Sequence, residues 1–242
     1  MMKSDAIIVS AGRGQRFMPG RKKQFHLLAD KPILAHTVEK FETCHTVQSI
    51  VLVVAQEDMD YCLEEIVEKF GYRKVCRIVP GGKLRQESVK NGIDSLPRDS
   101  DIVAIHDGVR PFVTREMIEE SIHAAARFQA VVLAMPVKDT IKMVHPDGTV
   151  LKTLDRESIW QIQTPQTFQV NVIKEAYQQA TREGFIGTDD ATLVERLGVK
   201  VHVLPGAYSN IKITTLEDLT LANFFLEKGF TDTDQSGRRE EG

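Results

Sequence analysis

Short, unbroken apolar runs alternate with amphipathic segments along the first half of the chain, and this alternation restricts the fold more than any other feature. Each run is bounded by turn or polar residues and has the length of a strand buried on both faces. Strands that alternate with helices are joined by right-handed crossovers in a mainly parallel sheet. The sequence therefore predicts an α/β, Rossmann-like fold with strands at 6–9, 49–55, 75–79, 101–105 and 130–135, and with helices at 31–42, 57–70, 88–96 and from 114 onward.

The first apolar run, residues 6–9, leads into a turn of small residues and then into a cluster of cations. Small side chains let successive backbone N–H groups face outward, and such a concavity binds phosphate. Arginine matches phosphate oxygens two at a time, whereas lysine acts as a movable point charge. Five cations follow within eleven residues: Arg13, Arg16, Arg21, Lys22 and Lys23. This stretch is therefore predicted to hold a polyanion.

The turn after the first strand differs from the common nucleotide-binding loops. No Gly-Lys-[Ser/Thr] follows at the Walker A spacing, and Phe17 occupies the third glycine position of G-x-G-x-x-G. A Gly-x-Gly pair after a strand is also compatible with an ordinary tight turn into a helix. The neighbouring cations favour phosphate binding over that alternative.

Two other strand ends carry glycine or polar residues. Gly81-Gly82 follows the strand at 75–79, and His106-Asp107 ends the strand at 101–105. Ligands of parallel sheets bind beyond the carboxyl ends of the strands, so these ends are predicted to meet at one site. The Asp107 carboxylate could hold Mg²⁺ against phosphate oxygens, or it could be a turn or capping residue. His106 could be a base, although a structural histidine is the more common case at a strand end.

The pattern changes between residues 137 and 160. Two alternating segments flank Asp147-Gly148, which is a hairpin signal. Because an isolated two-stranded hairpin is marginal in water, we expect an arm at about 137–160 that packs on a second subunit. The α/β pattern then resumes, and the sequence predicts helices at 170–181, 189–197 and 216–227, strands at 199–204 and 211–213, and a polar, disordered tail at 231–242. Residues 1–230 are predicted to form a single domain that includes the arm.

Composition narrows the classes of function. The 242 residues carry a net charge of −3, which argues against a general nucleic-acid binder. No apolar run approaches the roughly 20 residues of a membrane span, and the N-terminus lacks the features of a secretory signal. The three cysteines, Cys44, Cys62 and Cys76, show no paired spacing, so reduced thiols in a cytoplasmic protein are expected.

Three polar positions in the second half have ordinary interpretations as well as functional ones. Arg156 taken alone is a surface arginine, and Lys212 on a short apolar strand could be a snorkelling lysine. Thr188-Asp189-Asp190 has the pattern of a helix N-cap. No Ser-His-Asp, Cys-His or zinc-ligand spacing stands out, so the sequence offers no obvious protein nucleophile.

Together these motifs resemble the 2-C-methyl-D-erythritol 4-phosphate cytidylyltransferase family from about Ala6 to Leu226. The matching blocks are Ala11-Gly12-x-Gly-x-Arg16, Lys23-Gln24, Gly81-Gly82-x-x-Arg85-x-x-Ser88, His106-Asp107-x-x-Arg110-Pro111, Asp139-Thr140-Ile141-Lys142, Thr153-Leu154-Asp155-Arg156, Gln163-Thr164-Pro165-Gln166, Thr188-Asp189-Asp190 and Asn210-Ile211-Lys212-Ile213-Thr214. Two positions depart from the family pattern. Lys22 stands where proline usually precedes the motif lysine, and Gly108 stands where alanine is commoner.

The resemblance implies a sheet of the nucleotide-diphospho-sugar transferase type, with a protruding β-hairpin arm that is exchanged between the two subunits of a homodimer. It also implies that CTP and 2-C-methyl-D-erythritol 4-phosphate give 4-diphosphocytidyl-2-C-methyl-D-erythritol and pyrophosphate, with Mg²⁺, in non-mevalonate isoprenoid synthesis. The substrate phosphate would attack the α-phosphorus in line, so that catalysis consists of positioning and charge neutralisation.

The resemblance further implies roles for single residues. The developing charge would be stabilised by Arg16, Lys23 and Lys212. The nucleotide would be bound by Ala11, Gly12, Gly82, Arg85, Ser88 and Asp107, and Asp107 would also help to place the metal. The methylerythritol phosphate would be recognised by Arg110 and Thr188, and by Thr140 and Arg156 of the neighbouring subunit.

Two alternative functions are another enzyme of the same fold and a non-catalytic nucleic-acid-binding module. A cytidylyltransferase of the same fold could act on ribitol 5-phosphate, but Lys142 and the Thr-Leu-Asp-Arg block favour methylerythritol phosphate. A non-catalytic RNA-binding module would use residues 13–23 and would show steep salt dependence. The acidic net charge and the lack of aromatic residues among the cations argue against RNA.

Overall fold

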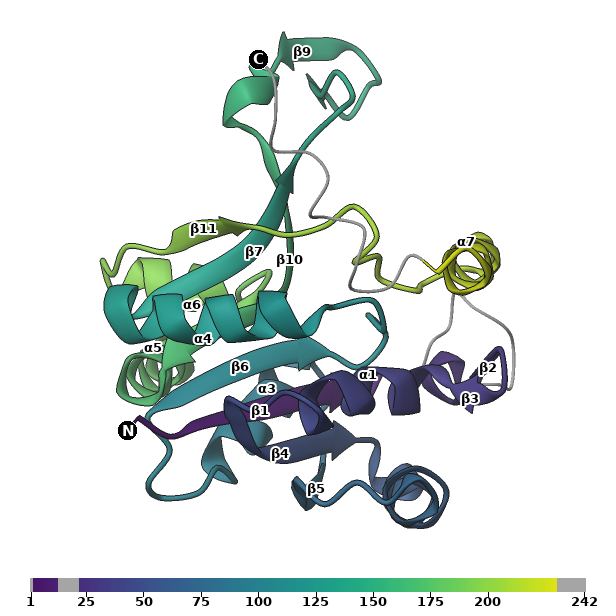
Figure 1. Cartoon of the computed structure of the whole chain (residues 1–242). Coiled ribbons are helices and arrows are strands. Elements are labelled where there is room, and N and C mark those ends of the chain that lie inside the picture. Colours follow the sequence, from purple (N-terminus) through teal and green to yellow (C-terminus); the bar gives the residue numbers. More distant parts are fainter. Residues whose placement is uncertain (1, 13–21, 230–242) are drawn as a thin grey trace.

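A seven-stranded sheet forms the centre of the computed structural model, which describes residues 2–12 and 22–229 (Figure 1). Its strand order is β11-β7-β10-β6-β1-β4-β5. In sequence order the strands are β1 (Ser4–Ser10), β4 (Val47–Val54), β5 (Val75–Pro80), β6 (Ile102–Asp107), β7 (Ala130–Pro136), β10 (Trp160–Gln169) and β11 (His202–Pro205). The predicted positions of the first five strands are confirmed to within a few residues.

All neighbouring strands of this sheet are parallel except β10, which is antiparallel to both β6 and β7. The prediction of a mainly parallel sheet is therefore confirmed, but β10 was not predicted. The carboxyl ends of β1, β4, β5 and β6 meet at one edge, as the glycine and polar strand ends indicated. The predicted strand at 199–204 is shorter, because β11 begins only at His202.

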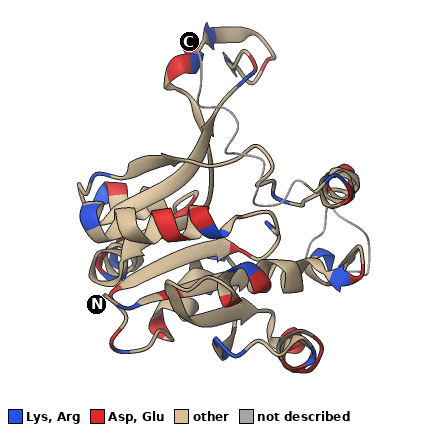
Figure 2. Cartoon of the chain, viewed as in Figure 1, with Lys and Arg blue, Asp and Glu red and all other residues tan. Residues whose placement is uncertain are grey.

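Helices cover both faces of the sheet (Figure 1). One hydrophobic cluster joins the sheet to α1 (Ile33–Glu42) and α4 (Arg115–Phe128), and a second joins the other face to α3 (Arg85–Asp94), α5 (Val170–Glu183) and α6 (Asp190–Arg196). Thr114 caps α4 by accepting a hydrogen bond from the Met117 backbone, as predicted. Charged residues lie mainly on the helices and connecting segments, whereas the strands of the central sheet contain few of them (Figure 2).

The prediction that residues 57–70 are helical is confirmed, but the type of helix changes along the segment. It consists of a 3₁₀ turn η2 (Gln56–Asp58), a short α2 (Met59–Tyr61) and a π-helical stretch η3 (Cys62–Glu68). The segment still ends at Gly71, whose φ of +67° favours glycine. The prediction of a strand at 211–213 was wrong: Ile213 N donates to Val109 O (2.9 Å), but the segment joins no sheet.

The C-terminal helix α7 (Leu216–Glu227) packs beside the small β2 (Leu27–Leu28) and β3 (Lys31–Pro32) pair. A third hydrophobic cluster, made of Leu28, Ile33, Val109, Phe112, Ile213 and Ala222, fixes this part of the chain. Because Ile213 is fully buried in that cluster, its neighbour Lys212 is held next to the end of β6. No helix of the described residues is long and apolar enough to cross a membrane.

Residues between β7 and β10 form another two-stranded sheet, separate from the central sheet and from the β2–β3 pair. Strand β8 (Lys142–Val144) pairs antiparallel with β9 (Val150–Thr153), and a 3₁₀ turn η4 (Arg156–Ser158) follows (Figure 1). Both strands are exposed along their whole length. Large apolar side chains of this region are also exposed, namely Met143, Val144, Val150, Leu151, Trp160 and Ile162.

Candidate active site

A cavity of about 1050 Å³ opens at the sheet edge where β1, β4, β5 and β6 end. Its lining comes from the turn after β1, the start of η2, the turn after β5, the first turn of α3, the end of β6 and Lys212. Eight of the residues that the sequence singled out lie on this wall: Ala11, Gly12, Lys23, Gly82, Arg85, Ser88, Asp107 and Lys212. Strand ends that are far apart in sequence therefore form one site, as predicted.

Small residues are required where the turns after β1 and β5 approach each other. A Cβ atom added to Gly81 would lie 2.2 Å from the Ala11 Cβ atom, and one added to Gly82 would lie 2.3 Å from the Glu87 Cβ atom. The Gly82 N–H donates to Ser88 Oγ at 3.0 Å, which fixes the turn against α3. Among the described residues, no other atom lies within 4 Å of a Cβ added to Gly12, so none of them covers the backbone of the first turn. A ligand can therefore approach this backbone closely.

Lys23 is placed by the 3₁₀ turn η1 (Lys23–Phe25), which returns the chain to the end of β1. The side chain of Gln24, 1% exposed, donates to the carbonyl oxygens of Ser10 (3.0 Å) and Gly12 (3.5 Å). Gln24 belongs to the Lys23-Gln24 block of the sequence, in which only Lys23 was predicted to have a role. Arg13, Arg16 and Arg21, which were predicted to contribute to phosphate binding, lie outside the described residues.

The Asp107 carboxylate is buried at the end of β6 and is surrounded by three cations. Its Oδ2 lies 2.9 Å from Lys212 Nζ and 3.6 Å from Arg110 Nε, and its Oδ1 lies 3.4 Å from Arg85 Nε. Burial raises the pKa of this carboxyl, but the positive charges of Arg85, Lys212 and Arg110 lower it by more. The net pKa is therefore well below the usual range. Asp107 is therefore ionised at neutral pH.

A second carboxylate, that of Asp190, holds the Arg85 guanidinium in place. Its Nη1 and Nη2 donate to Asp190 Oδ1 and Oδ2 at 3.0 and 2.9 Å, and Tyr177 donates its hydroxyl to Asp190 Oδ1 at 2.6 Å. Burial lowers the pKa of the Arg85 guanidinium, but Asp190 and Asp107 raise it by more. Sequence reasoning missed Asp190 as a partner, since its only local signal was the N-cap pattern. Asp189 is the residue that caps α6, by accepting from Thr192 N.

His106 is buried behind the site and is hydrogen-bonded to both Arg110 and Thr164. Its Nε2 lies 3.1 Å from Arg110 O, which can only accept, so Nε2 carries the proton. Its Nδ1 therefore accepts from the Thr164 hydroxyl at 3.0 Å, and that hydroxyl accepts from Asp107 N at 3.1 Å. Burial lowers the pKa of His106 to about 4. A neutral, fully buried ring cannot reach a ligand, so the structural interpretation of His106 is favoured over the base.

The four residues predicted to bind the second substrate do not line the cavity. Arg110 lies beside it and donates from Nη1 to Asn210 O at 2.7 Å. Thr188 lies near the start of α6 and hydrogen-bonds the Thr192 hydroxyl at 3.2 Å. Thr140 and Arg156 belong to the region of the β8–β9 pair, and both side chains are exposed. Within the described part of one chain, the structure therefore assembles the predicted nucleotide residues but not the predicted sugar-phosphate residues.

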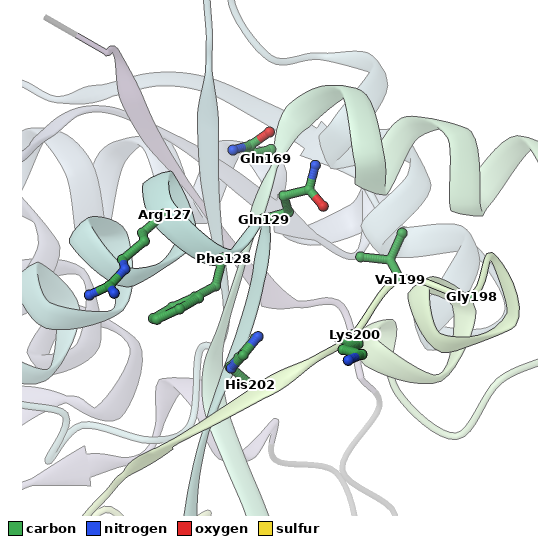
Figure 3. A pocket seen from close by; sticks show the side chains of 8 residues that line it. All are labelled: Arg127, Phe128, Gln129, Gln169, Gly198, Val199, Lys200 and His202. Atoms are coloured by element: carbon green, nitrogen blue, oxygen red, sulfur yellow. The ribbon is translucent and has the colours of Figure 1, made fainter.

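A second cavity, of about 590 Å³, lies at the opposite edge of the sheet, where β7 and β11 begin (Figure 3). Phe128 and His202 stack in it with ring centroids 4.3 Å apart, and Arg127 covers Phe128 at 4.8 Å. No carboxylate of the described residues lines this cavity, and the glycine in its lining, Gly198, follows helix α6 and not the carboxyl end of a strand. Since ligands of such sheets bind at the carboxyl edge, the cavity at the ends of β1, β4, β5 and β6 is the candidate active site.

A mainly parallel α/β sheet with a glycine-lined, cation-rich cavity at its carboxyl edge is the arrangement of a nucleotide-binding enzyme of the nucleotidyltransferase class. The model of the family "IspD: 2-C-methyl-D-erythritol 4-phosphate cytidylyltransferase" matches residues 5–228. The chain belongs to this family.

Relatives and solved structures agree with this assignment. The chain is 46% identical, over 227 residues, to the 2-C-methyl-D-erythritol 4-phosphate cytidylyltransferase of Caldanaerobacter subterraneus subsp. tengcongensis, covering 94% of this chain and 100% of that one. The crystal structure of 4-diphosphocytidyl-2C-methyl-D-erythritol synthase from Anaerococcus prevotii superposes with a TM-score of 0.83 at 33% identity, covering 93% and 96%. The Thermus thermophilus cytidylyltransferase gives a TM-score of 0.75 at 26% identity, covering 93% and 100%.

Proposed function

We propose that this chain transfers the cytidylyl group of CTP to 2-C-methyl-D-erythritol 4-phosphate and releases pyrophosphate, as a cytoplasmic enzyme of non-mevalonate isoprenoid synthesis. The observation that carries the proposal is the convergence of eight family motif residues on one cavity. These residues come from separate blocks of the sequence. Their meeting at the carboxyl edge of the sheet supports a single nucleotide site.

The bond that forms joins the substrate phosphate oxygen to the α-phosphorus of CTP, and the bond that breaks releases pyrophosphate. Neither a cysteine nor a histidine lines the cavity among the described residues. Ser88 Oγ already accepts from Gly82 N and donates to Leu84 O. A direct in-line transfer fits this lining better than a covalent enzyme intermediate does. Arg16, Lys23 and Lys212 stabilise the charge on the α-phosphoryl group and on the leaving pyrophosphate.

The cytidine occupies the space between the turns after β1 and β5. Ala11, Gly12 and Gly82 line this space with small side chains or none, and Ser88 holds the second turn in place. Arg85 lines this space as well, but three of its nitrogens contact Asp190 or Asp107. We therefore assign Arg85 chiefly to shaping the nucleotide site and to placing Asp107.

Asp107 is the residue that would hold Mg²⁺ together with the phosphate oxygens of CTP. No group of three or more metal-ligating side chains occurs among the described residues. Mg²⁺ often uses one carboxylate plus phosphates and water, so a single ionised carboxylate on the cavity wall fits it. The ion would neutralise phosphate charge in the transition state, while Lys212 keeps the carboxylate charged and oriented.

The second substrate is recognised at a site completed by a partner subunit in a homodimer. Arg110 and Thr188 come from the main body, and Thr140 and Arg156 come from the hairpin region of the neighbouring copy. Exposed apolar side chains on β8 and β9, such as Met143, Val144 and Leu151, support a protein contact there. Groups of large apolar side chains that are exposed to water usually mark interaction surfaces.

A coupled pyrophosphate-release assay tests the proposal. The purified chain is incubated with CTP, Mg²⁺ and either 2-C-methyl-D-erythritol 4-phosphate or ribitol 5-phosphate. We expect turnover with the first alcohol phosphate and little with the second. Turnover only with ribitol 5-phosphate would favour the rival cytidylyltransferase, and salt-sensitive RNA binding without turnover would favour the RNA-binding module.

A further inference from the structure

The Lys22 ammonium is paired with two carboxylates of η2, the turn that follows β4, and one of them, Glu57, lines the edge of the nucleotide cavity. Its Nζ lies 2.8 Å from Asp58 Oδ1, 2.8 Å from Asp58 Oδ2 and 2.9 Å from Glu57 Oε1. The side chain of Asp58 is only 11% exposed. A lysine ammonium has three donors, and three carboxylate oxygens surround this one. Unlike Lys23, Lys22 is absent from the cavity lining.

The Lys22 ammonium remains charged in this environment. Burial lowers its pKa, but the hydrogen bonds and charges of Asp58 and Glu57 raise it by more, so the net pKa is raised. Because the pair is partly buried, removing either partner leaves a charge without its counterion.

Lys23 lies between two residues, Lys22 and Gln24, whose side chains are bound at the ends of two different strands. On one side, Lys22 is bound to Asp58 and Glu57 in η2, at the end of β4. On the other side, the Gln24 amide is bound to the carbonyl oxygens at the end of β1. The backbone between them forms η1, in which Phe25 N donates to Lys22 O at 3.0 Å. Two neighbouring strand ends therefore fix the position from which the Lys23 side chain reaches the cavity.

We propose that Lys22 is a positioning residue, whose ion pairs with Asp58 and Glu57 hold Lys23 at the phosphate site. This inference rests on the proposed function. The Lys22 backbone is extended, with φ −76° and ψ 118°. Proline restricts φ to about −65 ± 15°, so the Lys22 backbone already has a conformation that proline would fix covalently. The ion pairs replace that rigidity in this chain.

The alternative is that Lys22 itself contacts the phosphates. The two roles make opposite predictions for the Lys22→Pro variant, which removes the charge but keeps the backbone conformation. Lys22→Ala removes the charge and its ion pairs and does not restrict φ in their place. Lys69→Ala is a matched control, since Lys69 forms an exposed ion pair with Glu65 (2.6 Å) far from the cavity lining.

The experiment measures kcat and KM for CTP in wild type, Lys22→Ala, Lys22→Pro, Asp58→Asn and Lys69→Ala, with folding verified by circular dichroism. We expect Lys22→Ala and Asp58→Asn each to lose roughly 10- to 100-fold in kcat, because a small misplacement of a catalytic group is costly. The Lys22→Ala/Asp58→Asn double variant should lose no more than either single variant. Lys22→Pro should recover most of the lost rate, and Lys69→Ala should match wild type.

Two results would overturn the inference: wild-type turnover in Lys22→Ala, or equal damage in Lys22→Pro and Lys22→Ala. A second measurement is independent of the proposed function. Hydrogen exchange at the Phe25 and His26 amides, which donate to Lys22 O and Lys23 O, should be faster in Lys22→Ala but not in Lys22→Pro. An inactive wild type would contradict the proposed function alone, whereas unchanged exchange in Lys22→Ala would contradict the positioning role.

Discussion

Arg85 and Asp190, 105 residues apart in sequence, are joined by two parallel hydrogen bonds of 3.0 and 2.9 Å. Arg85 begins α3 and Asp190 begins α6, so the pair ties together two helices on the same face of the sheet. The same guanidinium extends to Asp107 at the end of β6. A structural ion pair and the carboxylate of the candidate active site therefore share one arginine.

The first prediction concerns stability. Asp190 is 1% exposed, so Arg85→Met should lower the free energy of unfolding by about 3–5 kcal/mol, because it leaves this buried carboxylate without its counterion. Asp190→Asn should cost less, because Arg85 keeps its ion pair with Asp107. The double variant should be little worse than Arg85→Met alone. Chemical denaturation measures all four proteins. Arg196→Met is the control, because Arg196 pairs with the exposed Glu183 and should lose only about 0–1 kcal/mol. Additive losses in the double variant would contradict the coupling.

The second prediction is a pH dependence that originates at His106. In the unfolded chain a histidine binds a proton below a pH of about 6.5, whereas burial lowers the pKa of His106 in the folded state to about 4. Between these values the unfolded state holds the extra proton. The free energy of unfolding should therefore fall as the pH is lowered, by at most about 1.4 kcal/mol per pH unit from this residue.

Denaturation curves of wild type, His106→Gln and His45→Gln measure this effect across that pH range. His106→Gln should be less stable at neutral pH, because the bonds to Thr164 and Arg110 change, but its pH slope should be smaller. His45 is exposed, so its variant should keep the wild-type slope. The same slope in all three proteins would contradict this prediction, because it would show that His106 binds protons equally well in the folded and the unfolded state.

Local features of the sequence were enough to locate the site. Gly81-Gly82 and Asp107 immediately follow or end apolar runs, and parallel strands bring such ends to one edge. The bond between Arg85 and Asp190 could not be predicted in the same way, because it depends on how two distant helices pack. Gln24 was likewise invisible as an anchor, since its acceptors are backbone oxygens that carry no sequence signal.

Strand β10 escaped prediction for a physical reason. Pro165 lies in its middle and cannot donate to a ladder, so the sequence reads as an interrupted segment. In the structure the pairing with β7 shifts register between Ile162 and Gln166, and the proline falls in that interruption. The polar side chains there are satisfied by side-chain bonds, such as Gln163 Nε2 to Ala207 O at 2.7 Å. Because buried residues of β10 are polar, the strand could not be recognised from a pattern of apolar residues.

The third prediction separates charge neutralisation from stability. Lys23→Ala and Lys212→Ala should remain folded but lose on the order of 10²–10³ in kcat, the usual cost of removing one preorganised donor. Steady-state kinetics with both substrates, together with the thermal midpoint, measure the two quantities. Near-normal turnover in folded Lys23→Ala would remove that lysine from the mechanism. Arg16→Ala is expected to behave in the same way as Lys23→Ala.

The fourth prediction concerns the second substrate. Arg156→Ala should weaken use of 2-C-methyl-D-erythritol 4-phosphate by ~1.5–3 kcal/mol, the value of a hydrogen bond to a charged group, and should leave the KM for CTP nearly unchanged. Exposed Arg98, on the loop before β6, provides the control variant Arg98→Ala. Equal effects on both substrates would contradict the assignment of Arg156 to the sugar phosphate.

The fifth prediction tests whether Arg156 acts on the site of its own chain or on that of a partner. In a mixed dimer of Lys23→Ala and Arg156→Ala chains, a shared site would combine Lys23 of one chain with Arg156 of the other. One of the two sites is then intact, and the other lacks both side chains. Unfolding and refolding an equal mixture should restore about one quarter of wild-type activity, since half of the dimers are hybrids with one working site each. If Arg156 served its own chain, every site in the mixture would lack one residue, and activity would stay at the level of the separate variants.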